Sequence, residues 1–495
     1  MKRLATVAFC AAALLAQTKR PVRKAATPKP TTIAGYSTLT LDPANPHYFR
    51  FRGRTTAFIT SGEHYGAVLN TKFDIPKYLD TLAENHLNLT RIFNGAYLEP
   101  VDSTVANIPN NTLAPAPANY QSPWLRVAGE GTARFDLSKF DDRYFARLRS
   151  FITEAGKRNI AVEVTLFSVI YGSGKGGWGS WSILPMNPAN NIGGIGPKAW
   201  DRFTTMDNPA LIAAQDALVK RTVIELNGFD NVYYEICNEP YFSGATAKET
   251  EAWTNHLIAT VKDAEAKLPN QHLIAENIAN GSATVKSPNP AISIYNFHYA
   301  TPPATVALNW GLKKPVAFDE TSARCSAADR RKEAWAFLFA GGAVYNNLDP
   351  SFTDTNIPPD ACAEIRYQLG ILQTFVHRFE LQFLQPDQTT LRQWPLGSGD
   401  AYVLSEPGRT YGVYLKSNGG AKTRQSMLVL DLPAGRYQID WLNPRTGDND
   451  KADPLDHKGG LVRVLTPDYT EDLALRLAKI EGPPKPKPVP NPARK

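Results

Sequence analysis

The chain has 495 residues, enough for two or three domains, and 43% of them are hydrophobic, as in a folded globular protein. Its formal net charge of +7 is misleading, because residues 1–34 carry +7 and residues 481–495 carry +3, so that the residues between them sum to −3. The basic charge therefore lies in two tails. This excludes an extended basic surface of the folded part, so no nucleic-acid partner is expected.

The first residues have the pattern of a secretory signal. Two basic residues precede an apolar run that ends at Ala16 and is too short to span a bilayer. Residues 1–16 are therefore predicted to be the signal peptide of a secreted or periplasmic protein, with an uncleaved anchor as the alternative. Residues 17–34 and 481–495, rich in Lys and Pro, are predicted to be disordered. No later stretch is long and apolar enough for stable membrane insertion.

Strand patterns and amphipathic helix patterns then alternate along most of the chain. A hairpin over residues 36–54 is predicted to cap the floor of a single (β/α)8 barrel, which spans residues 35–383. Two insertions, at residues 95–136 and 169–199, enlarge its top face. The predicted strands cover residues 55–60, 87–93, 160–167, 232–237, 272–276, 292–298, 316–320 and 338–346, and the predicted helices cover residues 75–84, 141–157, 208–226, 247–267 and 361–378.

From about residue 381 the apolar period changes to two. Short alternating runs between Gly, Pro and Asn turns predict a small antiparallel β-sandwich over residues 384–480. No cluster of carboxylates in this part matches a catalytic site. The sandwich is therefore predicted to pack on the barrel without being catalytic itself.

Two glutamates end strands that are apolar on both faces, as in a buried parallel sheet. The strand at residues 232–237 stops at Asn238 and Glu239, because the next residue is a proline and cannot donate to a ladder. Eighty-one residues later, a second such strand ends at Glu320. The interval admits three βα units, so the two glutamates would end strands four and seven and face each other across the barrel mouth, where such barrels carry their chemistry.

These two motifs, NEP at residues 238–240 and the one ending at Glu320, resemble those of the clan-A glycoside hydrolases, which include cellulases, mannanases and β-galactosidases. The resemblance covers roughly residues 50–380. It implies a retaining β-glycosidase in which Asn238 binds a sugar hydroxyl, Glu239 is the acid/base and Glu320 the nucleophile. It also implies an oligo- or polysaccharide substrate, no cofactor, no metal, and a monomer. The alternative is a non-catalytic carbohydrate-binding or adhesion protein on the same scaffold.

The resemblance extends to further side chains at strand ends. Arg91, at the end of strand two, resembles the arginine that bonds the nucleophile in that clan. His298 and Tyr299, after strand six, resemble its histidine and aromatic pair, with Tyr295 as the alternative tyrosine. The chain departs from the cellulase and mannanase families because it lacks a His at the end of strand three and a Trp at the end of strand eight. The motifs therefore leave the sugar undetermined.

Other substrate-binding candidates lie in loops on the same face. Glu63 and His64 follow strand one and suit hydroxyl binding, with a metal site as the weaker alternative because no third ligand is near in sequence. Trp178 and Trp181, in the insertion after strand three, would stack on sugar faces or, alternatively, pack beneath the loop.

The retaining mechanism makes a geometric prediction. Direct attack needs the two carboxyl groups about 5–5.5 Å apart, whereas an inverting pair leaves about 6.5–9.5 Å for a water molecule. Joint ionisation of so close a pair is unfavourable, so the pKa of Glu239 is expected to be raised while Glu320 is charged.

The cysteines give a separate prediction. Cys237 lies inside strand four and is expected to stay a free thiol. Cys325 and Cys362 follow strands seven and eight, in adjacent loops, where they could form a disulfide.

Overall fold

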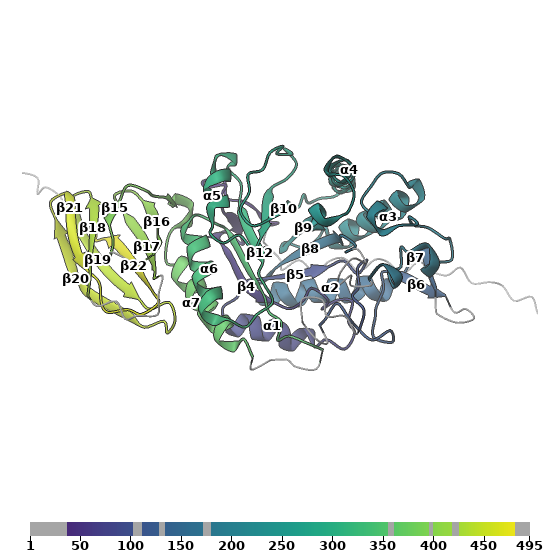
Figure 1. Ribbon diagram of the computed structural model, residues 1–495, viewed down its shortest axis with the longest axis horizontal. Helices are drawn as coiled ribbons and strands as arrows, with labels where there is room; N and C mark the ends of the chain where they lie inside the picture. Colours follow the sequence, from purple (N-terminus) through teal and green to yellow (C-terminus); the bar gives the residue numbers. More distant parts are fainter. Residues whose placement is uncertain are drawn as a thin grey trace, which may run out of the picture.

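The computed structural model describes residues 37–101, 111–127, 134–171, 180–354, 361–395, 399–417 and 425–480. The predicted signal peptide, the basic linker, the C-terminal tail and Trp178 lie outside these residues. Figure 1 shows a barrel and a smaller β-sandwich, which lie side by side along the longest axis of the molecule. Within the described residues, no helix is both long and apolar enough to cross a membrane.

Eight parallel strands form the barrel, in the order β4-β13-β12-β11-β10-β9-β8-β5. Backbone hydrogen bonds bring β5 back to β4: Asn88 donates to Ile59 at 3.2 Å, and Phe93 donates to Tyr65 at 2.9 Å. The predicted (β/α)8 barrel is therefore confirmed. The strands are β4 Phe58–Gly62, β5 Leu89–Phe93, β8 Ala161–Ser168, β9 Val232–Asn238, β10 Ile274–Asn280, β11 Ile294–His298, β12 Val316–Glu320 and β13 Val344–Leu348.

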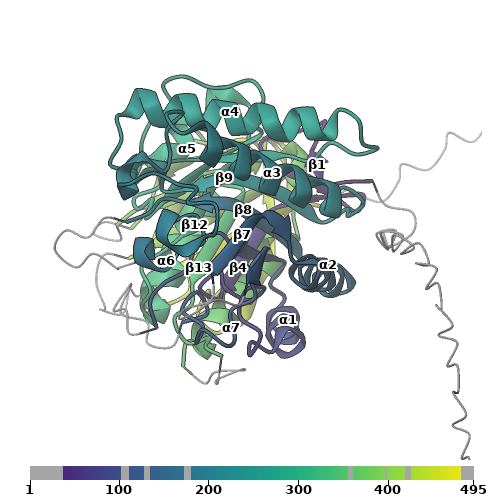
Figure 2. The ribbon, with the colours of Figure 1, turned by 90° about the vertical axis from the view of Figure 1, so that its right-hand side faces the viewer.

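Helices surround these strands, as Figure 2 shows. Their starts are encoded locally: the side chains of Asp74 and Asn208 cap α1 and α3, and Thr246 forms a capping box with Glu249 at α4. The α-helices are α1 Ile75–Glu84, α2 Asp142–Lys157, α3 Pro209–Leu226, α4 Ala247–Glu265, α5 Ala304–Asn309, α6 Ala327–Phe339 and α7 Ala363–Val376, and the 3-10 helices are Ser180–Ser182, Pro188–Asn190, Trp200–Arg202, Pro240–Phe242, Trp310–Leu312 and Leu381–Phe383.

The strand predicted at residues 338–346 is wrong in position. Leu338 belongs to the end of α6, and β13 begins only at Val344. Gly341 and Gly342 make the sharp turn between them. Gly341 has φ +104°, and a Cβ on Gly342 would lie 2.2 Å from the Phe337 ring. The apolar run looked like one strand because a buried helix end and a buried strand are joined by so short a turn.

The predicted N-terminal hairpin is a three-stranded antiparallel sheet of β1 Thr40–Leu41, β2 Phe49–Phe51 and β3 Arg54–Thr56. Arg52, at the turn between β2 and β3, binds Asp230 at 2.8 Å and the Gly156 carbonyl at 2.7 Å. Both partners precede barrel strands, so this sheet covers the amino-terminal end of the barrel, opposite the predicted site.

The C-terminal sandwich consists of a six-stranded sheet, β14-β16-β17-β22-β19-β20, and a three-stranded sheet, β15-β18-β21. It packs on α6 of the barrel, where Trp335 stacks on Tyr414 with ring centroids 5.4 Å apart. The strands are β14 Gln385–Pro386, β15 Leu391–Gln393, β16 Ala401–Glu406, β17 Thr410–Lys416, β18 Met427–Leu432, β19 Gly435–Leu442, β20 Asn449–His457, β21 Gly460–Leu465 and β22 Asp472–Lys479, while β6 Trp124–Val127 and β7 Arg134–Phe140 form a hairpin before α2.

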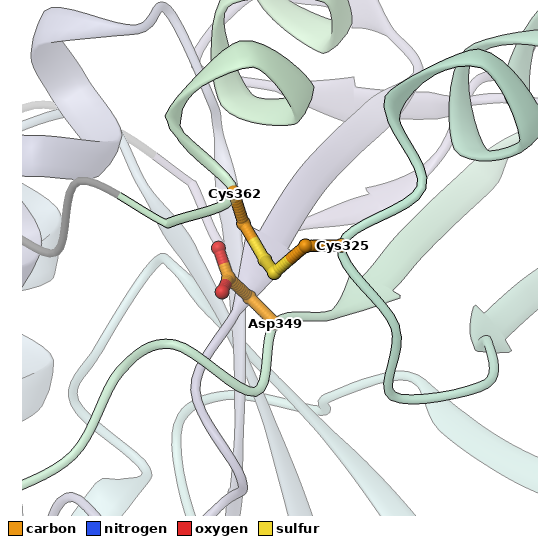
Figure 3. A group of neighbouring side chains, drawn as sticks. All are labelled: Cys325, Asp349 and Cys362. Carbon is orange, nitrogen blue, oxygen red and sulfur yellow. A yellow bond between two sulfur atoms is a disulfide. The ribbon is translucent and has the colours of Figure 1, made fainter.

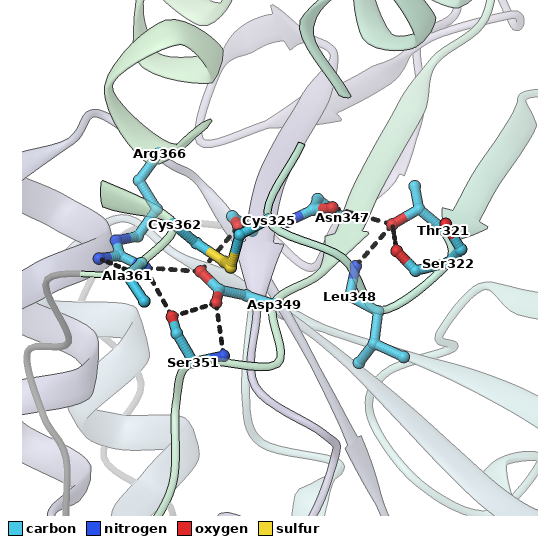
Figure 4. The surroundings of a disulfide bond; sticks show 11 residues. Thr321, Ser322, Cys325, Asn347, Leu348, Asp349, Ser351, Ala361, Cys362 and Arg366 are labelled. Carbon is cyan, nitrogen blue, oxygen red and sulfur yellow. Dashed lines mark hydrogen bonds and ion pairs between the residues drawn. A yellow bond between two sulfur atoms is a disulfide. The ribbon is translucent and has the colours of Figure 1, made fainter. Parts of the chain in front are cut away.

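A disulfide links the loop after β12 to the residue before α7. Cys325 and Cys362 are bonded with their Cα atoms 4.9 Å apart (Figure 3), which confirms the predicted pair. Cys237 is a buried free thiol. Asp349 lies beside the bond and accepts hydrogen bonds from Arg366 at 2.6 Å and from Ser351 (Figure 4). The crosslink therefore ties the loop after β12 to the start of α7, and the ion pair ties the residue after β13 to the same helix.

Candidate active site

The carboxyl ends of the barrel strands surround a cavity of about 210 Å³. A cavity of about 320 Å³ between α7 and the sandwich, and one of about 520 Å³ on the sandwich, are larger, but neither is lined by two glutamates. The 210 Å³ cavity is lined by three glutamates, Glu99, Glu239 and Glu320. Its lining residues are His64, Tyr65, Phe93, Tyr97, Glu99, Leu113, Tyr171, Asn238, Glu239, Tyr299, Glu320, Ala323 and Leu348.

Glu239 and Glu320 reach this cavity from the ends of β9 and β12. One oxygen of each carboxylate and a ring nitrogen of His298 all lie within 4.8 Å of one another. Glu239 has φ +50°, a left-handed conformation that is rare for a residue with a side chain. Its backbone N–H donates to the Asn277 side chain at 3.1 Å, which holds this irregular end of the strand in place.

Three donors converge on Glu320. Tyr299 donates to one oxygen at 2.8 Å, and Tyr65 donates to the other at 2.9 Å. Arg91 lies 3.4 Å from the same oxygen as Tyr65, with its guanidinium over the Tyr65 ring. Tyr295, the alternative tyrosine, lies instead near Lys314. Three donors on one carboxylate fix its rotamer and suit its charged form.

Glu239 has a different set of partners. His298 lies 3.1 Å from one of its oxygens, Tyr171 donates to the other, and Tyr241 lies 3.5 Å away. Burial by itself would lower the pKa of His298, but Glu320 and Asp319 outweigh burial and raise it well above its ordinary value. The buried ring is therefore an imidazolium that donates to Glu239.

The structure contradicts the expected raised pKa of Glu239. Burial does raise it, but the hydrogen bonds from His298 and Tyr171 outweigh burial, so that the pKa of Glu239 is lowered. The sequence placed His298 only beside the nucleophile. In the structure its ring is shared, at 3.1 Å from Glu239 and 3.5 Å from Glu320.

Beneath the pair, Arg91 holds together the other strand ends. It donates to Glu235 at 2.5 Å and to Asn238 at 2.9 Å, and it lies 3.8 Å from Asp319. Asn238 also donates to the Tyr171 hydroxyl at 3.0 Å. The amide of Asn238 therefore sits between the arginine and a partner of Glu239.

Three buried carboxyl groups, those of Glu163, Glu235 and Asp319, surround the side-chain amide of Asn296. The Asn296 side-chain nitrogen lies 2.9 Å from Glu163, 3.0 Å from Glu235 and 2.7 Å from Asp319, although it carries only two hydrogens. Burial, followed by repulsion from Asp319, raises the pKa of Glu163, and burial also raises that of Glu235. Burial acts on Asp319 too, but Arg91 and His298 outweigh it and lower its pKa. The environment therefore favours the neutral form at Glu163 and Glu235 and the charged form at Asp319.

The two candidates from the loop after strand one, Glu63 and His64, have different surroundings in the structure. His64 lines the cavity and binds Glu99 at 3.0 Å. Glu63 does not line it: the side chain is fully buried and accepts backbone hydrogen bonds from Gly66 at 2.9 Å and Ala67 at 3.2 Å. The expected substrate contact of Glu63 is therefore wrong, since its oxygens serve the turn after β4. Burial raises its pKa to about 7.

Trp181 does not line the cavity either. It is half-buried and packs edge-on against Phe203, with ring centroids 6.4 Å apart, which is the alternative considered from the sequence. Trp178 lies outside the described residues. Stacking of a sugar on Trp181 therefore finds no support in the cavity walls.

Several side chains of the site were not predicted as such. Tyr171 and Glu99 come from insertions, where no periodicity marks a residue as near the catalytic pair. Glu163 had a signal that could have been used: it is the only charged residue in the otherwise apolar strand at residues 161–168, as Glu235 is in β9.

No protein-family model matches this sequence, and no curated protein matches it. Solved structures do resemble the fold. One described as a glycoside hydrolase is 13% identical, covers 90% of this chain and 97% of its own, and has a TM-score of 0.59. A family 5 glycoside hydrolase from Bacteroides vulgatus ATCC 8482 is 11% identical, covers 89% of this chain and 93% of its own, and has a TM-score of 0.60. At such identities the likeness shows a shared fold, over the barrel and much of the sandwich.

Proposed function

We propose that this protein is a glycoside hydrolase that cleaves β-linked sugars with retention of configuration. The observation that carries this proposal is the short separation of Glu239 and Glu320, with oxygens within 4.8 Å across a cavity at the barrel mouth. A closest approach of this size suits the roughly 5–5.5 Å of a retaining pair better than the roughly 6.5–9.5 Å of an inverting pair, which admits a water molecule between the carboxyl groups.

Glu320 is the nucleophile in this proposal. Tyr65, Tyr299 and Arg91 hold its carboxylate toward the anomeric carbon. As Glu320 forms a bond to that carbon, the glycosidic bond breaks and Glu239 gives its proton to the leaving oxygen. In the second step Glu239 takes a proton from a water molecule, whose oxygen attacks the same carbon and releases Glu320 as a carboxylate.

The low pKa of Glu239 raises the question of where its proton comes from. Five carboxyl groups face two cations, Arg91 and His298, and the raised pKa values of Glu163 and Glu235 offset only part of this excess of acids. A neutral sugar that displaces water from this negative site favours uptake of one proton. Glu239 takes it, because Glu320 has the arginine. Once Glu320 is esterified its charge is gone, the pKa of Glu239 falls again, and Glu239 can act as base.

We also propose that the protein is secreted. The signal pattern of residues 1–16 supports this, and so does the Cys325–Cys362 bond, since disulfides persist mainly in oxidising compartments. The binding-only alternative would have been favoured by a filled cleft or by distant carboxylates. Neither is present at the mouth of this barrel.

The test is a screen of the purified protein against aryl β-glycosides of common sugars, with proton NMR of the first-formed product. We expect a β-anomer; an α-anomer would exclude retention, and binding without hydrolysis would favour the alternative. Glu320→Ala should abolish turnover of every substrate. Glu239→Ala should still release good leaving groups, and azide should restore its second step. Glu364→Ala, an exposed glutamate on α7, is the control and should behave as the wild type.

A further inference from the structure

The cavity is deep at one end and open at the other. Tyr97, Glu99 and Leu113 wall the deep end, and they are 3%, 3% and 1% exposed. At the other end lie Tyr299, which is 37% exposed, and Tyr241, which is 36% exposed. Both tyrosines contact the catalytic pair, since Tyr299 binds Glu320 and Tyr241 adjoins Glu239. Among the residues that the structure describes, the path past these tyrosines therefore ends at a buried wall beyond the carboxylates.

A continuous wall leads from the nucleophile to the deep end. Tyr65 donates to Glu320 and lies 5.6 Å from the His64 ring, centroid to centroid. His64 in turn binds Glu99 at 3.0 Å, and Asn111 donates to the other oxygen of Glu99 at 2.7 Å. Glu99 therefore lies beyond Glu320 on the side away from the entrance.

The deep end of the cavity holds polar side chains, His64 and Glu99, that close packing alone does not require. Burial alone would lower the pKa of His64, but Glu99, 3.0 Å away, outweighs it and raises the pKa, which favours an ion pair between the two buried side chains. Replacing such a buried ion pair by apolar side chains is often neutral or stabilising. A histidine and a glutamate side by side offer a donor and an acceptor to neighbouring hydroxyl groups, and Phe93 and Tyr97 add aromatic surface to the same wall.

The size of the cavity limits what fits. Its 210 Å³ is below the roughly 300–1,000 Å³ of pockets for drug-sized ligands, and it suits one sugar ring. The leaving group must then lie on the side of Glu239 that faces the exposed Tyr241, outside the deep end.

We infer that the site acts from the end of a glycan chain: it takes one terminal, non-reducing sugar into the deep end and releases monosaccharide. Glu99 and His64 bind hydroxyl groups of that ring and act as specificity-determining residues. This inference rests on the proposed function and adds which end of the glycan enters the site and how many sugars each cleavage releases.

The first test uses β-linked oligosaccharides that carry a fluorescent label at the reducing end. Exo action releases unlabelled monosaccharide first and shortens the labelled chain by one sugar at a time, and a cap on the non-reducing end should block cleavage. Early release of longer fragments, or cleavage of capped chains, would overturn the inference and leave the glycosidase intact. If neither oligosaccharides nor aryl glycosides are cleaved, the proposed function itself fails.

The second test removes the charge at the deep end. Glu99→Gln should lower kcat/KM on an aryl monoglycoside about 10- to 100-fold, because a hydrogen bond to a charged group is lost. Binding of the free monosaccharide product, measured by calorimetry, should weaken by a similar factor. Trp181→Phe, which changes a ring outside the cavity, is the matched control and should stay within about twofold.

A purely structural role for Glu99 would lower the melting temperature instead. If Glu99→Gln keeps the melting temperature of the wild type but binds and cleaves as well as the wild type does, the assignment of Glu99 is wrong. If this variant does not fold, His64→Gln tests the same wall from the other partner, with the same expected loss of product binding.

Discussion

The barrel mouth and the barrel–sandwich interface both bury an arginine among carboxylates, but they balance their charges differently. At the interface, Arg331 of α6 binds Asp472 of β22 at 2.9 Å, Gln368 at 2.9 Å and the partly exposed Glu471. Tyr414 completes the shell by donating to Asp472 at 3.0 Å. Each of these groups has a partner of opposite charge or a hydrogen bond.

At the mouth, acids outnumber bases. Arg91 and His298 face five carboxyl groups, those of Glu163, Glu235, Glu239, Asp319 and Glu320. Because so many anions cannot coexist away from water, some of the acids must hold protons. The matched pair of the interface serves stability, and the unmatched set at the mouth provides protons that can move. Five predictions test this contrast.

Removing the cation of the matched pair should have the largest effect. Arg331→Leu leaves Asp472 buried without its charge partner and should lower the free energy of unfolding by about 3–5 kcal/mol. Urea unfolding followed by circular dichroism measures it. Glu471→Gln, which removes only the partly exposed partner, should cost less than about 1 kcal/mol. Equal losses in the two variants would show that Arg331 and Asp472 are not the matched pair of the interface.

At the mouth, removing the anion that balances both cations should cost activity. In Asp319→Asn, His298 loses a carboxylate 3.3 Å away and Arg91 one at 3.8 Å. The pKa of His298 should fall, so that its proton no longer supports Glu239. We expect kcat/KM to fall about 10²- to 10³-fold, as for other buried charges that lose a partner. Nitrogen-15 NMR of the His298 ring should show loss of the imidazolium at lower pH than in the wild type.

The disulfide stabilises the mouth without taking part in its charge balance. Changing Cys325 and Cys362 to Ser opens a crosslink that spans 37 residues and should cost about 3–4 kcal/mol on the chain-entropy model. Dithiothreitol should lower the stability of the wild type by a similar amount and leave the double variant unchanged. A wild type that is insensitive to full reduction would argue against this role.

Glu63 is a buried carboxylate that accepts hydrogen bonds from Thr112 and from two backbone N–H groups, and it should make stability depend on pH. Its pKa is raised from 4.5 to about 7 in the folded chain, so the folded state binds this proton more tightly than the unfolded state does. The stabilisation is therefore complete below about pH 4.5 and is lost as the pH rises to about 7. The loss should reach about 2–3 kcal/mol. In Glu63→Gln this part of the pH profile should be flat, and parallel profiles would contradict the assignment.

The smallest effect should come from Glu163, whose raised pKa favours the neutral form. Glu163→Gln replaces a protonated carboxyl with an amide of the same shape, so stability should change by less than about 1 kcal/mol and kcat/KM by less than about threefold. It is the matched control for Asp319→Asn, because both side chains face Asn296. An activity loss as large as that of Asp319→Asn would show that Glu163 is charged.

Local sequence patterns were enough to predict the barrel, most of its helices and the two facing glutamates. The signals lie within a few residues of each feature: α1 begins at its Asp74 cap, and the strand before Glu239 ends because Pro240 cannot donate to a ladder. The order of strand ends then brings Glu239, Glu320 and Arg91 to one face, whatever the details of packing. Strand eight was misplaced because its pattern is equally that of a buried helix end.

The charges of these groups and their surroundings depend instead on tertiary contacts. The ring of His298 is shared by Glu239, Glu320 and Asp319, which reversed the expected shift in the pKa of Glu239. Tyr171 and Glu99 reach the site from insertions whose apolar residues show neither the helix period nor the strand period. A pKa depends on the distance to every nearby charge and on burial, and these contacts join residues far apart in the chain, so no local pattern encodes them.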